Sequence, residues 1–142
     1  KNYIFYIGIA SLTDKAKDKI LKSENMLPVT TLKGMYSYIE RVDYIITRGG
    51  FNSITECLFF KKPTIFMNEK FNPEVEENLK IVFDKNLGAL MNINDWKANF
   101  TKRVNKFVTK EVTSIKKNLE KNHFQSNGAN QLLKIILKDI KK

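Results

Sequence analysis

Residues 44–67 read "YIITRGGFNSITECLFFKKPTIFM", and this stretch decides the fold. It opens and closes on short apolar runs, Tyr44 to Thr47 and Thr64 to Met67, which are typical of buried strands. Between them a pair of glycines leads into a helix expected over Ser53 to Phe60, and Pro63 follows that helix. The order strand, glycine turn, helix, strand predicts a unit in which the two strands run parallel.

The same alternation extends along the chain in both directions. Further strands are expected at residues 3–9, 29–32 and 89–92, and further helices at residues 11–21, 35–42 and 74–85. Strands and helices that alternate through short links form a parallel sheet with helices on both faces. The sequence therefore predicts a doubly wound, Rossmann-like α/β fold.

Beyond Asn94 the composition changes to that of helices. Residues 95–124 are expected to be helical, and a last helix is expected to begin near Ser126 to Gly128. We therefore expect a single domain over residues 1–142, made of an α/β core (1–94) and carboxy-terminal helices (95–142). The chain begins at Lys1 rather than at Met, so we expect it to be a segment of a longer protein.

The net charge of +10 leaves two kinds of function open. A basic α/β module could bind nucleic acid or an anionic membrane without chemistry. The lysines, however, are spread over nearly every expected helix, and residues 97–142 interleave them with Glu and Asn rather than with stacking aromatics. We interpret them as solvated helix faces and expect no nucleic-acid partner.

Cysteine and histidine counts argue against a metal centre. With only Cys57 and His123, the chain cannot form an internal disulfide or a multi-cysteine zinc site. Cys57 is expected to be a buried thiol, and His123 a polar loop residue rather than a base. No apolar run reaches the roughly 20 residues that a membrane-spanning helix needs. We expect no metal and no cofactor.

The glycine turn is the main candidate site. In parallel sheets, ligands bind at the edge formed by the carboxyl ends of the strands, here called the ligand edge. Arg48, Gly49 and Gly50 follow a strand at that edge, and we expect Asn52 or Ser53 to cap the helix that comes next. Free backbone N–H groups and the positive end of the helix dipole would favour a phosphate there.

Glu56 allows two interpretations. A carboxylate one turn into this helix is suited to accept the hydroxyl groups of a ribose. Ser53 and Glu56 also fit a capping box, in which the two side chains satisfy the helix start without any ligand. The residues alone leave both interpretations open.

Residues 50–56, "GFNSITE", followed by Pro63, resemble the donor-binding motif of the GT-B nucleotide-sugar glycosyltransferases. Asp43 before the strand "YIIT", the strand "PTIFM" and the stretch "NLGALMN" are also similar to this family. The likeness covers roughly residues 3 to 95. It is to the carboxy-terminal, donor-binding domains of the UDP-glycosyltransferases and of the N-acetylglucosaminyltransferases that make the peptidoglycan lipid precursor.

The resemblance implies a role for each matching residue. Arg48, Asn52 and Ser53 match positions that contact the diphosphate, together with the turn at Gly49 and Gly50.

Away from the turn, Glu56 matches the ribose-binding position, and Leu32 matches the position whose backbone reads the uracil edge. Glu74 matches an acid that contacts the sugar, but Val75 stands where the family has a Gln. This departure leaves the donor sugar open.

The resemblance also implies what this chain lacks. The family's domain begins one strand earlier, and an acceptor domain with the catalytic base precedes it, so no catalytic residue is expected in this chain. The implied function is transfer of a hexose or N-acetylhexosamine from a UDP-sugar, in the cytoplasm, for cell-envelope polysaccharide. A hydrolase or epimerase of nucleotide sugars is the alternative on the same fold, and peripheral membrane contact is left open.

Overall fold

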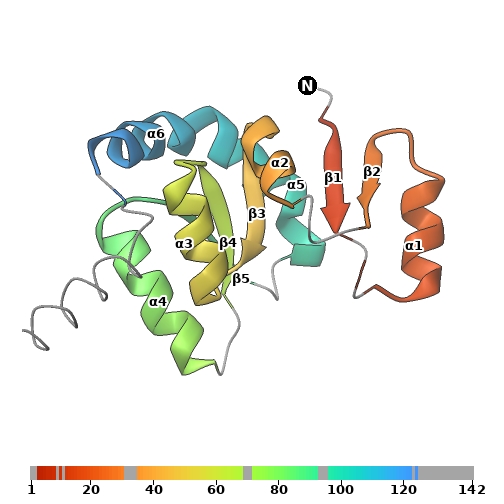
Figure 1. Ribbon diagram of the computed structural model, residues 1–142, viewed down its shortest axis with the longest axis horizontal. Helices are drawn as coiled ribbons and strands as arrows, with labels where there is room; N and C mark the ends of the chain where they lie inside the picture. Colours follow the sequence, from red (N-terminus) through yellow and green to blue (C-terminus); the bar gives the residue numbers. More distant parts are fainter. Residues whose placement is uncertain are drawn as a thin grey trace, which may run out of the picture. The chain divides into compact units, whose positions relative to one another are not determined.

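The computed structural model describes residues 3–8, 10, 12–30, 35–68, 72–92, 96–122 and 124. The chain divides into two units, Lys1–Val42 and Asp43–Lys142, and each is described by itself. The elements, in chain order (Figure 1), are β1 (Phe5–Gly8), α1 (Asp14–Leu21), β2 (Met26–Val29), α2 (Met35–Arg41), β3 (Ile45–Arg48), α3 (Phe51–Phe59), β4 (Thr64–Asn68), α4 (Pro73–Asp84), β5 (Ala89–Asn92), α5 (Trp96–Lys106), the π-helical segment η3 (Phe107–Glu111) and α6 (Val112–Lys121).

The first unit contains a two-stranded parallel sheet in which β1 pairs with β2. The predicted strand at residues 29–32 was wrong, because β2 starts at Met26 and ends at Val29. Pro28 lies inside β2, opposite Ile7. Proline is tolerated there because, among the described strands, β2 pairs with β1 only, so one of its edges needs no N–H donor.

The second unit contains a three-stranded parallel sheet in the order β3-β4-β5. Its register places Arg48 opposite Met67 and Asn68 opposite Asn92, so the three strands end together at one ligand edge. The predicted α/β class with parallel strands is confirmed.

Both faces of this sheet are covered. Thr64, Ile65 and Phe66 are all buried although successive strand residues point to opposite faces. Thr64 shares a side-chain hydrogen bond with Cys57 of α3, and Phe66 meets Val82 of α4 beside Gly88. The face of β4 that carries Thr64, Phe66 and Asn68 is therefore the face on which α3 and α4 pack.

The carboxy-terminal helices α5 and α6 confirm the helical prediction, but the π-helical turn η3 between them was not predicted. Arg103 fastens this region to the outer strand: its Nε donates to the carbonyl oxygen of Leu90 at 2.6 Å, and its Nη1 donates to Glu111 Oε2 at 2.8 Å. Lys106 Nζ adds an ion pair to Glu111 Oε1 at 3.3 Å. The last helix expected near residues 126–128 lies outside the described residues.

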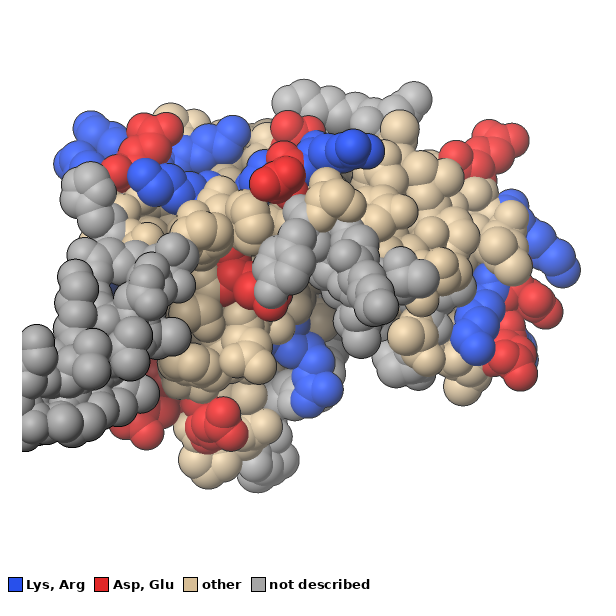
Figure 2. Space-filling model, in the orientation of Figure 1, with Lys and Arg blue, Asp and Glu red and all other residues tan. Residues whose placement is uncertain are grey.

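Charged side chains of both signs lie side by side over α6. Lys116, Lys117 and Lys121 are exposed, with Glu120 among them, and Figure 2 shows blue and red atoms interleaved there. This agrees with the interpretation of the lysines as a solvated helix face. None of the described helices combines the length and the apolar character needed to cross a membrane.

Candidate functional site

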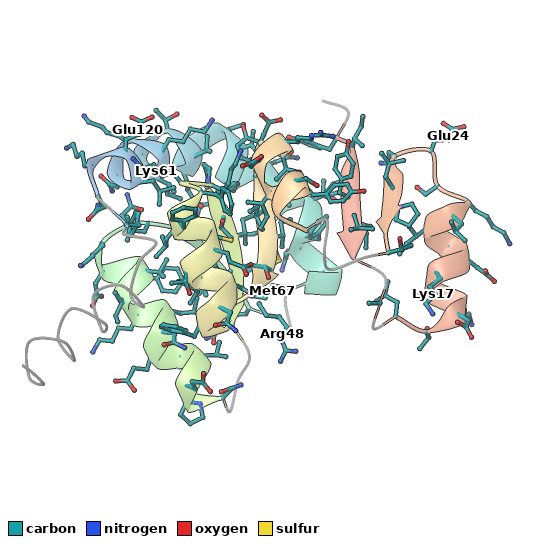
Figure 3. All side chains as sticks on the ribbon, in the orientation of Figure 1. Lys17, Glu24, Arg48, Lys61, Met67 and Glu120 are labelled. Atoms are coloured by element: carbon teal, nitrogen blue, oxygen red, sulfur yellow. The ribbon has the colours of Figure 1, made fainter. Side chains whose placement is uncertain are left out.

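The candidate site is built on the turn that joins β3 to α3. Arg48 is the last residue of β3 and is exposed, and Figure 3 shows it beside Met67 at the ligand edge of the second unit. Gly49 and Gly50 follow, and α3 begins at Phe51. The turn thus brings a guanidinium group and a helix N-terminus to the same edge.

The cap of α3 differs from the expectation. Gly50 is the N-cap, with φ −68° and ψ 148°, and has no side chain to cap the helix. The prediction that Asn52 or Ser53 would cap it was wrong, and the capping-box interpretation fails because Ser53 is already the third helical residue. The cause is that Gly49 is buried at the end of the sheet, so the helix begins as soon as the chain leaves it.

The two glycines have different surroundings. A Cβ at Gly49 would meet three Leu79 side-chain carbons at 2.7 to 2.8 Å, so this glycine lets α4 pack closely. A Cβ at Gly50 would meet no atom within 4 Å. Gly49 therefore serves packing, whereas the backbone at Gly50 borders open space.

The first turn of α3 is suited to an anion. Its first N–H groups have no partner within the helix, the N-cap Gly50 has no side chain to bind them, and the turn contains no acidic residue. A helix start of this kind carries a partial positive charge. With Arg48 adjacent, the arrangement can bind a phosphate or diphosphate group.

Cys57 confirms one prediction, because the thiol is 3% exposed. Burial raises the pKa of Cys57 to about 11, the negative charge of Glu56 adds to this, and a hydrogen bond with Thr64 opposes it. A thiol with so high a pKa is protonated at neutral pH and is no nucleophile. Glu56 itself is half-buried on the second turn of α3.

The remaining predicted residues are placed as follows. Asn52 is exposed and Ser53 is half-buried, both in the first turn of α3, and Glu74 is exposed in the first turn of α4. Leu32 and His123 lie outside the described residues. The binding roles of these residues stay predictions.

Two residues at the site were given no role by the sequence. Asn68 ends β4 at the ligand edge, and Asn78 lies on α4; each has a buried amide atom without a hydrogen-bond partner. A polar residue at the carboxyl end of a buried strand is the signal that could have singled out Asn68. In the ranges that the structure describes, no three His, Cys, Asp or Glu side chains gather as metal ligands.

Comparison with known families identifies the chain as a glycosyltransferase domain. The chain belongs to the family described as "Glycosyltransferase family 28 C-terminal domain", whose model matches residues 4–136. This confirms the predicted kinship with the carboxy-terminal half of GT-B glycosyltransferases.

A curated relative points in the same direction. The chain is 29% identical over 99 residues to the UDP-N-acetylglucosamine--N-acetylmuramyl-(pentapeptide) pyrophosphoryl-undecaprenol N-acetylglucosamine transferase of Thermosipho africanus (strain TCF52B). The aligned region is 68% of this chain and 29% of that enzyme. The chain therefore spans less than a third of the relative it matches.

Proposed function

We propose that this chain is the donor-binding domain of a glycosyltransferase that transfers a hexose or N-acetylhexosamine from a UDP-sugar to an acceptor. The observation that carries the proposal is the start of α3, where the N-cap is Gly50, which has no side chain to cap the first N–H groups, and where a Cβ at Gly50 would meet no atom within 4 Å. Family membership supports the proposal, and the relative named above acts with UDP-N-acetylglucosamine.

In this proposal the diphosphate binds at Arg48, the Gly49–Gly50 turn, Asn52 and Ser53. As the sugar leaves, negative charge develops on the nucleoside diphosphate. Preorganised N–H groups and the adjacent guanidinium stabilise that charge more than they stabilise the bound substrate, which lowers the barrier. This contribution needs neither a metal ion nor a cofactor.

The other ligand contacts extend from the turn. Glu56 accepts the ribose hydroxyl groups, the backbone at Leu32 reads the uracil edge, and Glu74 contacts the sugar. The catalytic base and the acceptor site belong to an acceptor domain or a partner chain, so this chain alone binds the nucleotide weakly and catalyses little. We place the complete enzyme in the cytoplasm, with the inner face of the membrane as a peripheral site of action.

Titration of the chain with UDP, followed by amide chemical shifts, tests the proposal. We expect shifts at residues 48–56 and around Leu32, with those at residues 48–56 weakened in Arg48→Ala and in Glu56→Ala. Lys121→Ala is the matched control, because it also removes one exposed positive charge but lies one turn beyond Asn118, which contacts the end of α4 opposite to the ligand edge. Absence of any shift at millimolar UDP would contradict the proposal.

Two rivals give different results. A basic module that binds nucleic acid or anionic lipid predicts an affinity that falls steeply with salt, is shared by many lysines and is indifferent to Glu56→Ala. A nucleotide-sugar hydrolase or epimerase predicts the same UDP shifts. Product analysis of the complete enzyme separates this second rival, because it yields free sugar or an isomer instead of a glycosylated acceptor.

A further inference from the structure

Two amide atoms beside the candidate site lack hydrogen-bond partners. They are Asn68 Oδ1, an acceptor, and Asn78 Nδ2, a donor, and both are buried. Buried polar atoms in folded proteins are nearly always paired, and leaving one unpaired costs stability. A pair of complementary unpaired atoms therefore calls for a functional explanation.

The packing of α4 on β4 places both of these residues toward the ligand edge. Phe66 and Val82 converge on Gly88, at 2.7 Å and 3.0 Å from where its Cβ would stand. Asn68 lies two residues beyond Phe66 on the same face of β4, about 7 Å along the strand.

Asn78 lies one turn before Val82 on the same face of α4, about 6 Å along the helix. Because β4 runs toward the ligand edge and α4 runs back from it, both steps lead in the same direction. Asn68 and Asn78 therefore lie toward the ligand edge, on the sides of β4 and α4 that pack against each other.

The neighbours of Asn78 connect this position to the phosphate turn. Leu79, the next residue, fills the space against Gly49. Glu74 lies one turn before Asn78 on α4 and is exposed in the first turn of that helix. The two amides therefore lie between the glycine turn and the carboxylate expected to contact the sugar.

We propose that Asn68 and Asn78 together bind one hydroxyl group of the donor's sugar, an inference that rests on the proposed function. A hydroxyl donates one hydrogen bond and accepts others, so a single group can satisfy both atoms at once. The terminal amide torsion of asparagine is soft, so both amides can turn toward a hydroxyl that enters from the edge.

The residue at position 75 explains why two asparagines would contact the sugar in this chain. Val75, which stands where the family has a Gln, is apolar and only 6% exposed, so its side chain offers the sugar no hydrogen bond. Asn68 and Asn78 supply amide groups that Val75 lacks. The sugar is then read by two asparagines from two elements instead of one glutamine.

The test compares the affinity of the chain for UDP, UDP-N-acetylglucosamine and UDP-glucose by calorimetry. We expect Asn68→Leu and Asn78→Leu each to weaken binding of the preferred UDP-sugar about tenfold, with UDP affinity unchanged. Leucine keeps the volume and removes the unpaired atoms, so neither variant should lower the melting temperature.

Asn118→Leu is the matched control. The Asn118 amide is already paired, donating to the carbonyl oxygen of Asn86 at 3.2 Å. This variant should lower the melting temperature and leave the ratio of UDP to UDP-sugar affinities unchanged.

The outcomes separate this inference from the proposed function. If the ratio of UDP to UDP-sugar affinities is unchanged in Asn68→Leu and Asn78→Leu, this inference is wrong. Binding of UDP would still support the proposed function. An unchanged ratio with a lower melting temperature overturns the inference as well and indicates that a structural water bridges the amides. Failure of the wild-type chain to bind UDP overturns the proposed function and this inference together.

Discussion

The two helices that start at the ligand edge of the second unit satisfy their first turns in opposite ways. At α4, the Asn72 side chain accepts from the N–H of Val75 at 3.4 Å, Pro73 removes one donor, and two acids lie in the first turn. At α3, the N-cap is Gly50, which has no capping side chain, and no acid lies in the first turn.

Under the proposed function, this difference separates the helix start that binds the diphosphate from a helix start that only stabilises its own helix. A helix that only needs to be stable fills its first turn with its own oxygen atoms and carboxylates, as α4 does. The start of α3 lacks both features, which in the proposed function leaves its positive potential available to the diphosphate.

The largest expected effect comes from Gly49→Ala. The new Cβ would lie 2.7 Å from Leu79, which is 2% exposed and cannot move aside. We expect a loss of about 1 to 3 kcal/mol in the free energy of unfolding, measured in urea. A fully stable variant would contradict the close approach of α4 to this glycine.

Gly50→Asp should separate stability from binding. An aspartate at the N-cap supplies the oxygen that α3 lacks, so the free energy of unfolding should rise by about 0.5 to 1 kcal/mol. The same carboxylate repels a diphosphate, so the UDP affinity should fall at least about tenfold. If stability and UDP affinity change in the same direction, the contrast drawn between the starts of α3 and α4 is wrong.

Asn72→Ala makes the reverse change on α4. Removal of this cap should lower the free energy of unfolding by about 1 kcal/mol, because the N–H of Val75 loses its partner. Chemical-shift titration should show the UDP affinity unchanged. A clear loss of affinity would mean that the start of α4 also holds the diphosphate.

The smallest expected effect is a dependence of stability on pH. The buried face of α3 carries a titrating group, whereas the buried residues of α4 include none. The folded pKa of Cys57, about 11, lies above its unfolded value of 9.0. The protonated thiol therefore stabilises the fold below pH 9, and this stabilisation is lost as the pH rises toward 11.

Relative to pH 8, the free energy of unfolding at pH 9.5 should fall by about 0.8 kcal/mol through this group. Urea unfolding of wild type and Cys57→Ala at both pH values isolates the contribution, because other titrating groups are shared. A stability difference between the two proteins that does not shrink at pH 9.5 would contradict the raised pKa.

The sequence predicted elements well where local signals suffice. Strand β5 begins directly after Gly88 and was predicted with its observed bounds. Prediction from the sequence failed where residues distant along the chain determine the local structure. The start of α3 was misplaced because Asn52 and Ser53 are the better caps by local preference, whereas the burial of Gly49 under Leu79, thirty residues away, fixes the turn.

Likewise, the site was only partly readable. The motif from Gly50 to Glu56 pointed to the turn, but no local pattern shows that Asn68 and Asn78 both lie toward the ligand edge, because this depends on how α4 lies on β4. The π-helical turn η3 was missed since the apolar spacing around Phe107 continues through it.

The hydrogen bonds and the ion pair of Arg103 affect whether another strand can add to the edge of this sheet. Among the described strands, β5 lies at one edge of its sheet, and its Leu90 carbonyl already accepts a hydrogen bond from the Arg103 guanidinium, which is itself paired with Glu111. A foreign strand that added itself to β5 would have to displace this ion-paired side chain. Self-association through the edge of β5 is therefore disfavoured. This protects a basic, lysine-rich protein from aggregation by strand addition at one edge of its sheet.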